Sequence, residues 1–330
     1  MIIYHAVSFY QILSVIVHKA TYHKDTPAVL LLPDFITSKL PQYKRIEKSG
    51  IFDEVYLFPY AKIKFNPLTI VAATKKWYNR TVPYDIRSFE KIYSAGTHFF
   101  FSLVPIKARL PFTAFEDSKG MIFTPDFLIK PLEDTFPVHA WIAKKYGLFS
   151  FKNEFISEVI VDKKNIAYPV NQTEFHLTDA LSQLDDDTRK VICNIFIDRL
   201  YDIAGDEVVL LTEQFSNLGM LTQEQQETLY RYVCETYYKG ERLIIKPHPD
   251  DKTKYEELIE NCTVIREQFP SELFRYVFSA KPKKIVTVSS TAVNHLKNYC
   301  ETEFLADNEE FINNIGKLNI PTNYFRRTKK

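Results

Sequence analysis

The stretch ERLIIKPHPDDKTKYEELIEN, residues 241–261, decides how we interpret the fold of this chain. Its apolar run LII leads into a histidine between two prolines, and the part from Asp251 onward has the polar and apolar spacing of a helix. An apolar strand that is followed closely by a helix is typical of a βα unit in a parallel sheet. We therefore expect His248 at the carboxyl end of a buried strand, where sheets of this class bind their ligands.

The same βα pattern repeats on both sides of this stretch. In the first half, apolar strands are predicted at 1–7, 28–34, 52–59, 91–96 and 111–117, with helical segments between them. In the second half, strands are predicted at 206–216, 241–249, 262–267 and 283–290. Long helices between strands favour parallel sheets. We predict an α/β chain with two doubly wound, Rossmann-like domains, residues 1–165 and 166–330, that face a central cleft.

Charge and composition argue against several classes of protein. The chain has 42 basic and 41 acidic residues, a balance that argues against nucleic-acid binding. It contains neither GxGxxG nor GxxxxGK[ST], so neither a nicotinamide dehydrogenase nor a P-loop enzyme is indicated. Its four cysteines form no CxxC pair, and the three aspartates at 185–187 are interpreted as the start of a helix. We expect no metal.

The two ends of the chain bear on its location. The first twenty residues are apolar, but they lack the basic region and the cleavage site of a signal peptide, and polar side chains interrupt them. We expect a cytoplasmic protein with reduced thiols. The ending FRRTKK, 325–330, is interpreted as a solvated terminus, with peripheral attraction to the inner face of an anionic membrane as the alternative.

Polar clusters follow three of the predicted strands. They are Glu116 and Asp117 in FEDSKG, Lys246 and His248 in KPHPDD, and Ser289, Ser290 and Thr291 in VSSTA. The three hydroxyl residues stand where a strand passes into a predicted helix, 291–299. Free N–H groups and hydroxyl donors at such a point make a site for a phosphate. The alternative is that one of the three only caps the helix, but three in succession favour phosphate binding.

The prolines on both sides of His248 restrict its backbone, and a positioned histidine can donate a hydrogen bond or a proton to a departing phosphate. Lys246 would add positive charge or extend into solvent. A plain turn after a strand is the alternative for the whole segment. In an extended chain Glu116 and Asp117 point to opposite sides. One of them can therefore be a general base, while the other is structural.

Taken in this order, the three motifs resemble those of bacterial sialyltransferases of the lipooligosaccharide and capsule type and of their polysialyltransferase relatives. The opening VSFYQIL, 7–13, is similar to a short segment with which such enzymes begin, and VVLLTEQFS, 208–216, is similar to the strand that opens their second domain. The resemblance covers most of the chain. The sequence departs from it at Ser118, where the family has a glycine, since a glycine follows only at Gly120.

The resemblance implies a GT-B fold, inverting transfer from a CMP-activated sugar, and no required metal or cofactor. By position, Glu116 resembles the general base, with Asp117 as the alternative, and His248 resembles the histidine that assists the phosphate. The resemblance also implies contacts to the donor from Lys246, Pro249, Ser289, Ser290 and Thr291. It implies contacts to the acceptor from Ser8, Tyr10 and Gln11.

The leading hypothesis is a bacterial glycosyltransferase of the sialyltransferase kind. It would move sialic acid from CMP-sialic acid to an oligosaccharide or glycolipid acceptor of a capsule or lipooligosaccharide. Two rivals stay open: a glycosyltransferase with a UDP- or CDP-linked donor, and a non-catalytic sugar- or nucleotide-binding module on the same scaffold. The sequence identifies neither the acceptor nor the linkage, and it leaves a homodimer open.

Overall fold

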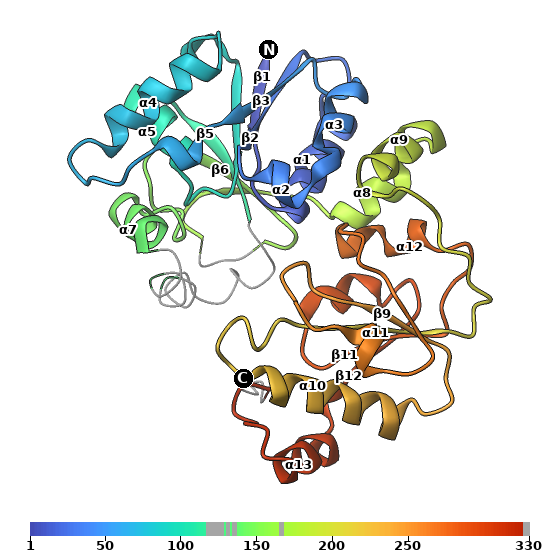
Figure 1. The fold of residues 1–330 in the computed structure, drawn as a ribbon. Coiled ribbons are helices and arrows are strands. Elements are labelled where there is room, and N and C mark those ends of the chain that lie inside the picture. The colour runs from blue at the N-terminus through green and yellow to red at the C-terminus, as the bar shows by residue number, and fades with distance from the viewer. Residues whose placement is uncertain (117–128, 130–132, 134–136, 165–167, 326–330) are drawn as a thin grey trace. The chain divides into compact units, whose positions relative to one another are not determined.

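The computed structural model describes residues 1–116, 129, 133, 137–164 and 168–325, apart from the side chains at 291, 294 and 295. The chain divides into two compact units, which we call unit 1 (Met1–Phe196) and unit 2 (Ile197–Lys330). Each unit contains a parallel sheet with helices packed against it (Figure 1). The α/β class and the two doubly wound units predicted from the sequence are thereby confirmed.

Unit 1 is built on a seven-stranded sheet with the order β3-β2-β1-β4-β5-β6-β7, in which neighbouring strands are parallel. Its strands are β1 (Ile2–His5), β2 (Ala28–Pro33), β3 (Glu54–Phe58), β4 (Lys91–Ala95), β5 (Phe112–Phe115), β6 (Ile156–Val161) and β7 (Asn171–Glu174). Its helices are α1 (Phe9–Tyr22), α2 (Ile36–Lys39), α3 (Lys44–Lys48), α4 (Ile70–Thr81), α5 (Leu103–Ala108), α7 (Pro137–Tyr146), α8 (Leu177–Gln183) and α9 (Asp186–Phe196). Short 3-10 turns are η1 (Pro41–Tyr43), η2 (Tyr60–Lys62), η3 (Ile86–Ser88) and η4 (Phe100–Ser102).

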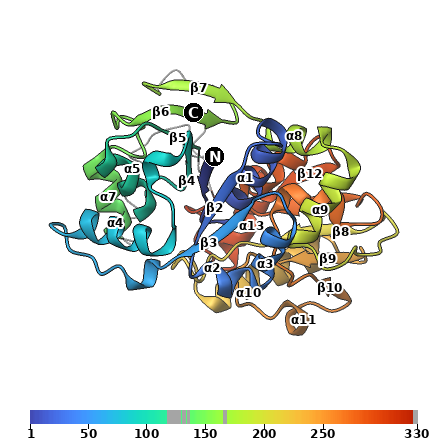
Figure 2. The ribbon, with the colours of Figure 1, turned by 90° about the horizontal axis from the view of Figure 1, so that it is seen from above.

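The sheet of unit 1 is covered on both faces. Figure 2 shows α4, α5 and α7 on one side of it and α1 and α3 on the other. Successive side chains of a strand point to opposite faces, so Ile3, Val29 and Leu31 share one face. They are buried in one core together with Ile70 of α4 and Val104 of α5. Complete burial of an aliphatic side chain of this size contributes roughly 1.5–3 kcal/mol to stability.

The boundary between the units lies at 196/197, whereas the sequence placed it at 165/166. Residues 166–196 belong to unit 1 because β7 pairs with β6, and because α8 and α9 both contact α1. β7 is an edge strand whose sequence is Asn-Gln-Thr-Glu, and none of its side chains is buried. It therefore lacks the apolar run of the five strands of unit 1 that the sequence predicts. β6, the strand beside it, has such a run but is not among the predicted strands either.

Unit 2 is built on a five-stranded parallel sheet with the order β10-β9-β8-β11-β12. Its strands are β8 (Val208–Leu211), β9 (Leu243–Lys246), β10 (Cys262–Val264), β11 (Lys284–Thr287) and β12 (Glu301–Phe304). Its helices are α10 (Gln223–Tyr232), α11 (Tyr255–Leu258), α12 (Phe274–Val277) and α13 (Glu309–Lys317), with a π-helical turn η6 (Val233–Tyr237) and 3-10 turns η7 (Ser271–Leu273), η8 (Thr291–Leu296) and η9 (Leu305–Asp307). The four predicted strands correspond to β8–β11, and β12 is an addition to them.

Candidate active site

The three polar clusters stand at strand ends, as the sequence predicts. β5 ends directly before Glu116, β9 ends two residues before His248, and β11 ends two residues before Ser289. Glu116 belongs to unit 1, whereas the other two belong to unit 2. Since β9 and β11 both flank β8, the histidine and the serines leave the sheet of unit 2 at the same edge, on the two sides of the chain that follows β8.

His248 is half-buried, and its ring has a defined orientation. The backbone N–H of Asp250 donates a hydrogen bond to its Nδ1 at 3.1 Å. A ring nitrogen that accepts a hydrogen bond carries no proton, so the proton of the neutral imidazole is on Nε2. The side chain is thereby prepared as an Nε2–H donor, the form that can donate a hydrogen bond or a proton to a phosphate oxygen.

The loop that carries His248 is anchored by Asp251, which sequence reasoning missed. The buried carboxylate of Asp251 accepts hydrogen bonds from the Thr212 hydroxyl at 2.9 Å and from the Tyr255 hydroxyl at 2.7 Å. Nε2 of Gln226 donates to its other oxygen at 2.9 Å. The N–H of Asp251 donates to the carbonyl of His248 at 2.9 Å. Since Thr212 follows β8 and Gln226 lies in α10, one carboxylate fixes the histidine loop to a strand and a helix.

Lys246 is buried and does not extend into solvent, so the interpretation of it as a solvent-exposed side chain is wrong. Its ammonium group lies 4.9 Å from the centre of the Phe269 ring and donates to the carbonyl of Pro247 at 3.3 Å. Burial lowers the pKa of Lys246 to about 8, and the nearby Glu267 opposes this change. The side chain therefore keeps most of its positive charge at neutral pH, inside unit 2 and next to the histidine loop.

Residues 289–291, which we call the serine segment, are held by Glu213, a second residue that sequence reasoning missed. One of its carboxylate oxygens accepts from the Ser289 N–H at 2.7 Å, the Ser289 hydroxyl at 3.2 Å and the Thr287 hydroxyl at 2.9 Å. The Tyr230 hydroxyl donates to the other oxygen at 2.7 Å. Burial raises the pKa of Glu213, although these hydrogen bonds act in the opposite direction. The chain after β8 thus fixes the chain after β11.

The hydroxyl groups of Ser289 and Ser290 are used differently. That of Ser289 donates to Glu213. That of Ser290 accepts from the N–H of Ala292 at 3.2 Å, so Ser290 caps η8. A hydroxyl that accepts through its oxygen can still donate its hydrogen to a ligand. Ser290 is therefore the better placed of the two to donate to a phosphate.

The helix predicted at 291–299 is the six-residue 3-10 turn η8, Thr291–Leu296. The cap of Ser290 closes on the second residue of that turn, which is the geometry of a tight turn and not that of a long helix. A phosphate site here would depend on hydroxyl and backbone donors more than on a helix dipole, since the dipole of so short a turn is small. The side chain of Thr291 lies outside the described residues.

We expect Glu213→Gln to loosen the serine segment. The glutamine amide keeps one acceptor oxygen but presents N–H groups where the carboxylate accepted, so some of the four donors around it lose their partner. The free energy of unfolding should fall by about 1–3 kcal/mol, as for other buried hydrogen bonds to charged groups, and binding of a nucleotide monophosphate should weaken. Denaturant melts and calorimetric titration with CMP measure both, with exposed Glu224→Gln in α10 as the control. Unchanged CMP affinity would show that nucleotide binding does not depend on the serine segment.

Glu116 is buried at the end of β5, with 6% of its surface exposed. The Tyr168 hydroxyl donates to one of its oxygens at 3.1 Å, and the N–H of Asp162 donates to the other at 3.3 Å. The carboxylate is therefore held against the neighbouring strand β6 and the chain that follows it. The described residues do not include Asp117, Ser118 and Gly120.

The predicted acceptor residues Ser8, Tyr10 and Gln11 form the start of α1. Ser8 and Gln11 make a capping box, in which the Gln11 side-chain oxygen also accepts from the N–H of Val7 at 2.9 Å. Gln11 is buried, and Gly96 approaches it so closely that a Cβ at this position would lie 2.9 Å from its oxygen. The burial of Gln11 gives it a structural role in the fold. Contact with an acceptor stays a prediction for the three residues.

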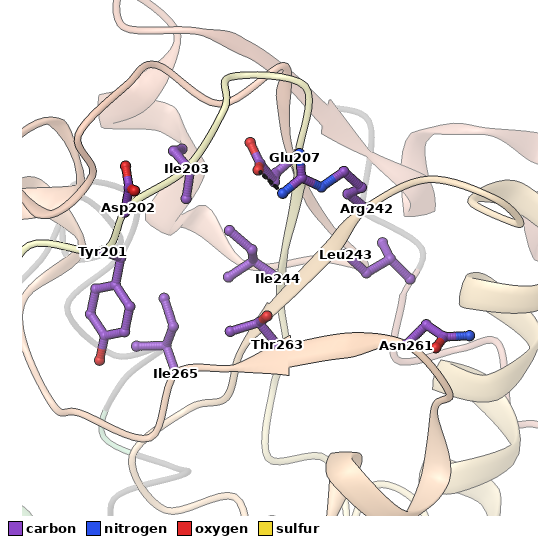
Figure 3. A pocket seen from close by; sticks show the side chains of 10 residues that line it. All are labelled: Tyr201, Asp202, Ile203, Glu207, Arg242, Leu243, Ile244, Asn261, Thr263 and Ile265. Atoms are coloured by element: carbon purple, nitrogen blue, oxygen red, sulfur yellow. Dashed lines mark ion pairs between the residues drawn. The ribbon is translucent and has the colours of Figure 1, made fainter.

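A pocket of about 170 Å³ in unit 2 lies away from this edge (Figure 3). Its lining includes Glu207 and Arg242, the residues directly before β8 and β9, so it lies where these strands begin. The buried Glu207 carboxylate pairs with Arg242 at 3.1 Å and accepts from the N–H groups of Ala204 and Gly205. The pocket is therefore at the amino ends of the strands, opposite the end that carries His248.

The aspartates at 185–187 begin a helix, as predicted. Asp185 accepts from the N–H and the hydroxyl of Thr188, both at 2.8 Å, directly before α9. Among the described residues, no group of three or more His, Cys, Asp and Glu side chains could hold a metal ion. In the same part of the chain, we find no helix that combines the length and the apolar character needed to cross a bilayer.

Comparison with known families gives a match over most of the chain. Residues 20–302 match the family described as alpha-2,8-polysialyltransferase. A segment of 90 residues is 32% identical to an uncharacterized protein of Haemophilus influenzae, and it covers 27% of this chain and 29% of that protein. The chain thus spans less than a third of the curated relative that it matches.

Solved structures with the same fold are distant in sequence. UDP-GlcNAc 2-epimerase from Neisseria meningitidis matches with a TM-score of 0.57 and 14% identity, over 93% of this chain and 83% of that one. A UDP-glucosyltransferase from Polygonum tinctorium matches with a TM-score of 0.50 and 10% identity, over 92% of this chain and 79% of that one. The GT-B domain of a sialyltransferase from Photobacterium damselae matches with a TM-score of 0.46 and 12% identity, over 89% of this chain and 88% of that one. At these identities the first two likenesses concern the fold alone, and the two doubly wound units are those of the GT-B fold.

Proposed function

The chain belongs to the alpha-2,8-polysialyltransferase family, and from this premise we propose that it is a glycosyltransferase that moves sialic acid from CMP-sialic acid to a sugar of a bacterial capsule or lipooligosaccharide. The observation that supports the choice most directly is the histidine loop of unit 2. There Asp250 keeps the proton of His248 on Nε2, and Asp251 fixes the loop to β8 and α10. An Nε2–H donor held in this way suits a leaving group that departs as a phosphate.

In the proposed reaction, unit 1 supplies the base and unit 2 holds the donor. An acceptor hydroxyl loses its proton to Glu116 while its oxygen forms a bond to the anomeric carbon of the sialic acid. The bond from that carbon to the phosphate oxygen breaks, and CMP leaves with the electron pair. A single displacement of this kind inverts the configuration at the anomeric carbon.

Negative charge grows on the phosphate as that bond breaks, and groups that meet it there lower the barrier. We assign this task to the Nε2–H of His248 and the hydroxyl of Ser290, with the buried charge of Lys246 beside the same loop. These groups would supply the stabilisation that a metal ion supplies in other transferases. The proposed reaction therefore needs no metal.

A panel of free nucleotides tests the donor. A ligand that binds the native state raises the melting temperature by mass action, so CMP should raise it more than UMP, UDP or CDP. Transfer from CMP-sialic acid to a sialylated oligosaccharide should persist in EDTA. A larger shift with UDP or CDP would replace the proposed donor, and activity that is lost in EDTA and restored by Mg²⁺ or Mn²⁺ would contradict the metal-free reaction.

Ser290→Ala should weaken the binding of CMP but leave that of cytidine nearly unchanged. A hydrogen bond to a charged phosphate is worth roughly 1.5–3 kcal/mol, which corresponds to an affinity about tenfold to hundredfold lower. Calorimetric titration of both ligands into both proteins measures the difference. Ser289→Ala is the comparison, because its hydroxyl already donates to Glu213. If cytidine and CMP weaken equally, Ser290 acts as a cap of η8 and the phosphate is held elsewhere.

A further inference from the structure

We propose that unit 1 docks on the surface of an anionic phospholipid bilayer through the segment 62–80 and the adjoining residues 141–145 of α7, which we call the docking surface. Binding to a membrane is a property separate from the transfer reaction, and it does not depend on the identity of the donor or the acceptor. The proposal rests on the charge, the exposure and the aromatic contacts of this part of unit 1.

The charge of segment 62–80 is one-sided. From 55 to 84 the sequence contains no Asp or Glu, and its cationic residues are Lys62, Lys64, Lys75, Lys76 and Arg80. Within the part of the chain that the structure describes, none of the five forms an ion pair with a carboxylate. In a chain whose formal net charge is only +1, this is a local concentration of positive charge. Clusters of this size are attracted to anionic lipid headgroups.

Apolar side chains are exposed among these cations. Leu68 is 94% exposed, the largest value for a large apolar side chain in the described residues, and Phe65 is 40% exposed. Both lie in the loop between η2 and α4, which projects outward from unit 1 in Figures 1 and 2. A single exposed leucine on a protein surface is ordinary. In a projecting loop and among lysines, however, it is placed to enter the boundary between headgroups and acyl chains.

Aromatic rings with cations over them adjoin this loop. The Phe65 ring packs edge-on against Trp141 of α7, with 5.4 Å between the ring centres, and the Lys145 ammonium lies 4.5 Å from the centre of the Trp141 ring. Trp77 of α4 has two further cationic groups over its ring, at 5.2 and 5.4 Å. Tryptophan rings beside Lys and Arg are typical of interfacial regions, where the ring lies at the headgroup level and the cation reaches a phosphate.

The combination favours a bilayer over a soluble polyanion. A charged glycan or nucleic acid would engage the cations, but it offers no apolar interior to the side chain of Leu68. A bilayer engages both kinds of side chain at once. Lys144, which lies within the α7 part of the docking surface, is not counted among its cations, because it is already paired with Glu133.

Sedimentation with lipid vesicles tests the proposal on the chain 1–330. The wild type should bind mixed phosphatidylcholine–phosphatidylglycerol vesicles, should bind pure phosphatidylcholine weakly, and should be released by high salt. Leu68→Ser should lower the partition coefficient about tenfold, since it removes one buried aliphatic side chain. Lys62→Gln with Lys64→Gln should lower it about twenty-fivefold, at about fivefold for each charge near the membrane.

Matched control variants separate the docking surface from general effects of charge and exposure. Leu200→Ser changes a leucine of unit 2 that is 64% exposed. Lys44→Gln with Lys48→Gln removes two exposed charges from α3, which lies on the other side of the sheet of unit 1 (Figure 2). Both controls should bind vesicles like the wild type. All positions are exposed, so thermal melts should be unchanged, and Phe65→Ser serves as a second apolar variant if Leu68→Ser is poorly expressed.

Several results would overturn the proposal. Vesicle binding that is equal in the loop variants and the wild type would remove this surface from consideration. Binding that is lost when residues 326–330 are deleted, but not in the loop variants, would assign the membrane contact to the basic terminus. Binding to heparin-agarose without vesicle binding, lost in the double lysine variant and kept in Leu68→Ser, would identify a surface for a soluble polyanion.

Discussion

His248→Ala should lower turnover about 10²–10⁴-fold, the range typical of a lost general acid, while the melting temperature changes little. The imidazole ring is half-buried, and Asp251 fixes the loop around it. Removal of the ring should therefore leave the backbone of the loop in place. The loss should appear mainly in kcat, because the charge that His248 is proposed to meet develops as the bond to the phosphate breaks. Initial rates with CMP-sialic acid, taken together with a thermal melt, measure both quantities.

His248→Gln separates hydrogen bonding from proton transfer at the same position. A glutamine Nε2 can occupy nearly the position of the imidazole Nε2 and donate a hydrogen bond, but it does not give up a proton near neutral pH. Activity between that of the wild type and that of His248→Ala would indicate that the hydrogen bond supplies part of the effect. His176→Ala, an exposed histidine of unit 1, is the control. If activity and melting temperature fall together in His248→Ala, the histidine is structural.

Glu116→Gln should also lower turnover about 10²–10⁴-fold and leave CMP affinity unchanged. The amide is nearly isosteric and keeps an oxygen for the N–H of Asp162, but it cannot take the proton of an acceptor hydroxyl. Tyr168→Phe is the matched comparison, because it removes one hydrogen bond to Glu116 and no charge. It should reduce turnover about tenfold or less, since it disturbs the orientation of the carboxylate and leaves its chemistry intact.

The same assay on Asp117→Asn decides between the two carboxylates. A much larger loss in Asp117→Asn than in Glu116→Gln would make Asp117 the base. Glu116, which is buried and hydrogen-bonded to the chain beyond β6, would then be the residue that fixes the end of β5.

The strands that position the site could be predicted because each is a buried apolar run that stops abruptly at polar residues. β9 and β11 are of this kind, and so is β5. β7 could not be predicted in this way, because its pairing with β6 depends on backbone hydrogen bonds and not on apolar side chains. The predicted boundary between the units, 165/166, lies before β7 for the same reason, whereas the structure has it at 196/197.

The residues that hold the site in place could not be predicted, because their partners are distant in the sequence. Glu213 accepts a hydrogen bond from Ser289, 76 residues further along the chain, and Asp251 accepts one from Thr212, 39 residues earlier. Nothing in the local pattern of TEQFS or PDDKT distinguishes such a carboxylate from one that faces solvent. The prolines beside His248 predict a rigid loop from the sequence alone. The structure shows that a network of hydrogen bonds around Asp251 also holds this loop in place.

The polar edge at β7 affects how copies of the protein behave when they are concentrated. An unpaired strand edge is a template on which another chain can add a strand, and this is a common beginning of aggregation. β7 is four residues long, none of its side chains is buried, and Glu174 at its end already accepts from the N–H of Lys164 at 3.1 Å. A second copy that paired with this edge would gain backbone hydrogen bonds but cover little apolar surface. The β7 edge of unit 1 should therefore resist edge-to-edge growth into fibres, even at high protein concentration.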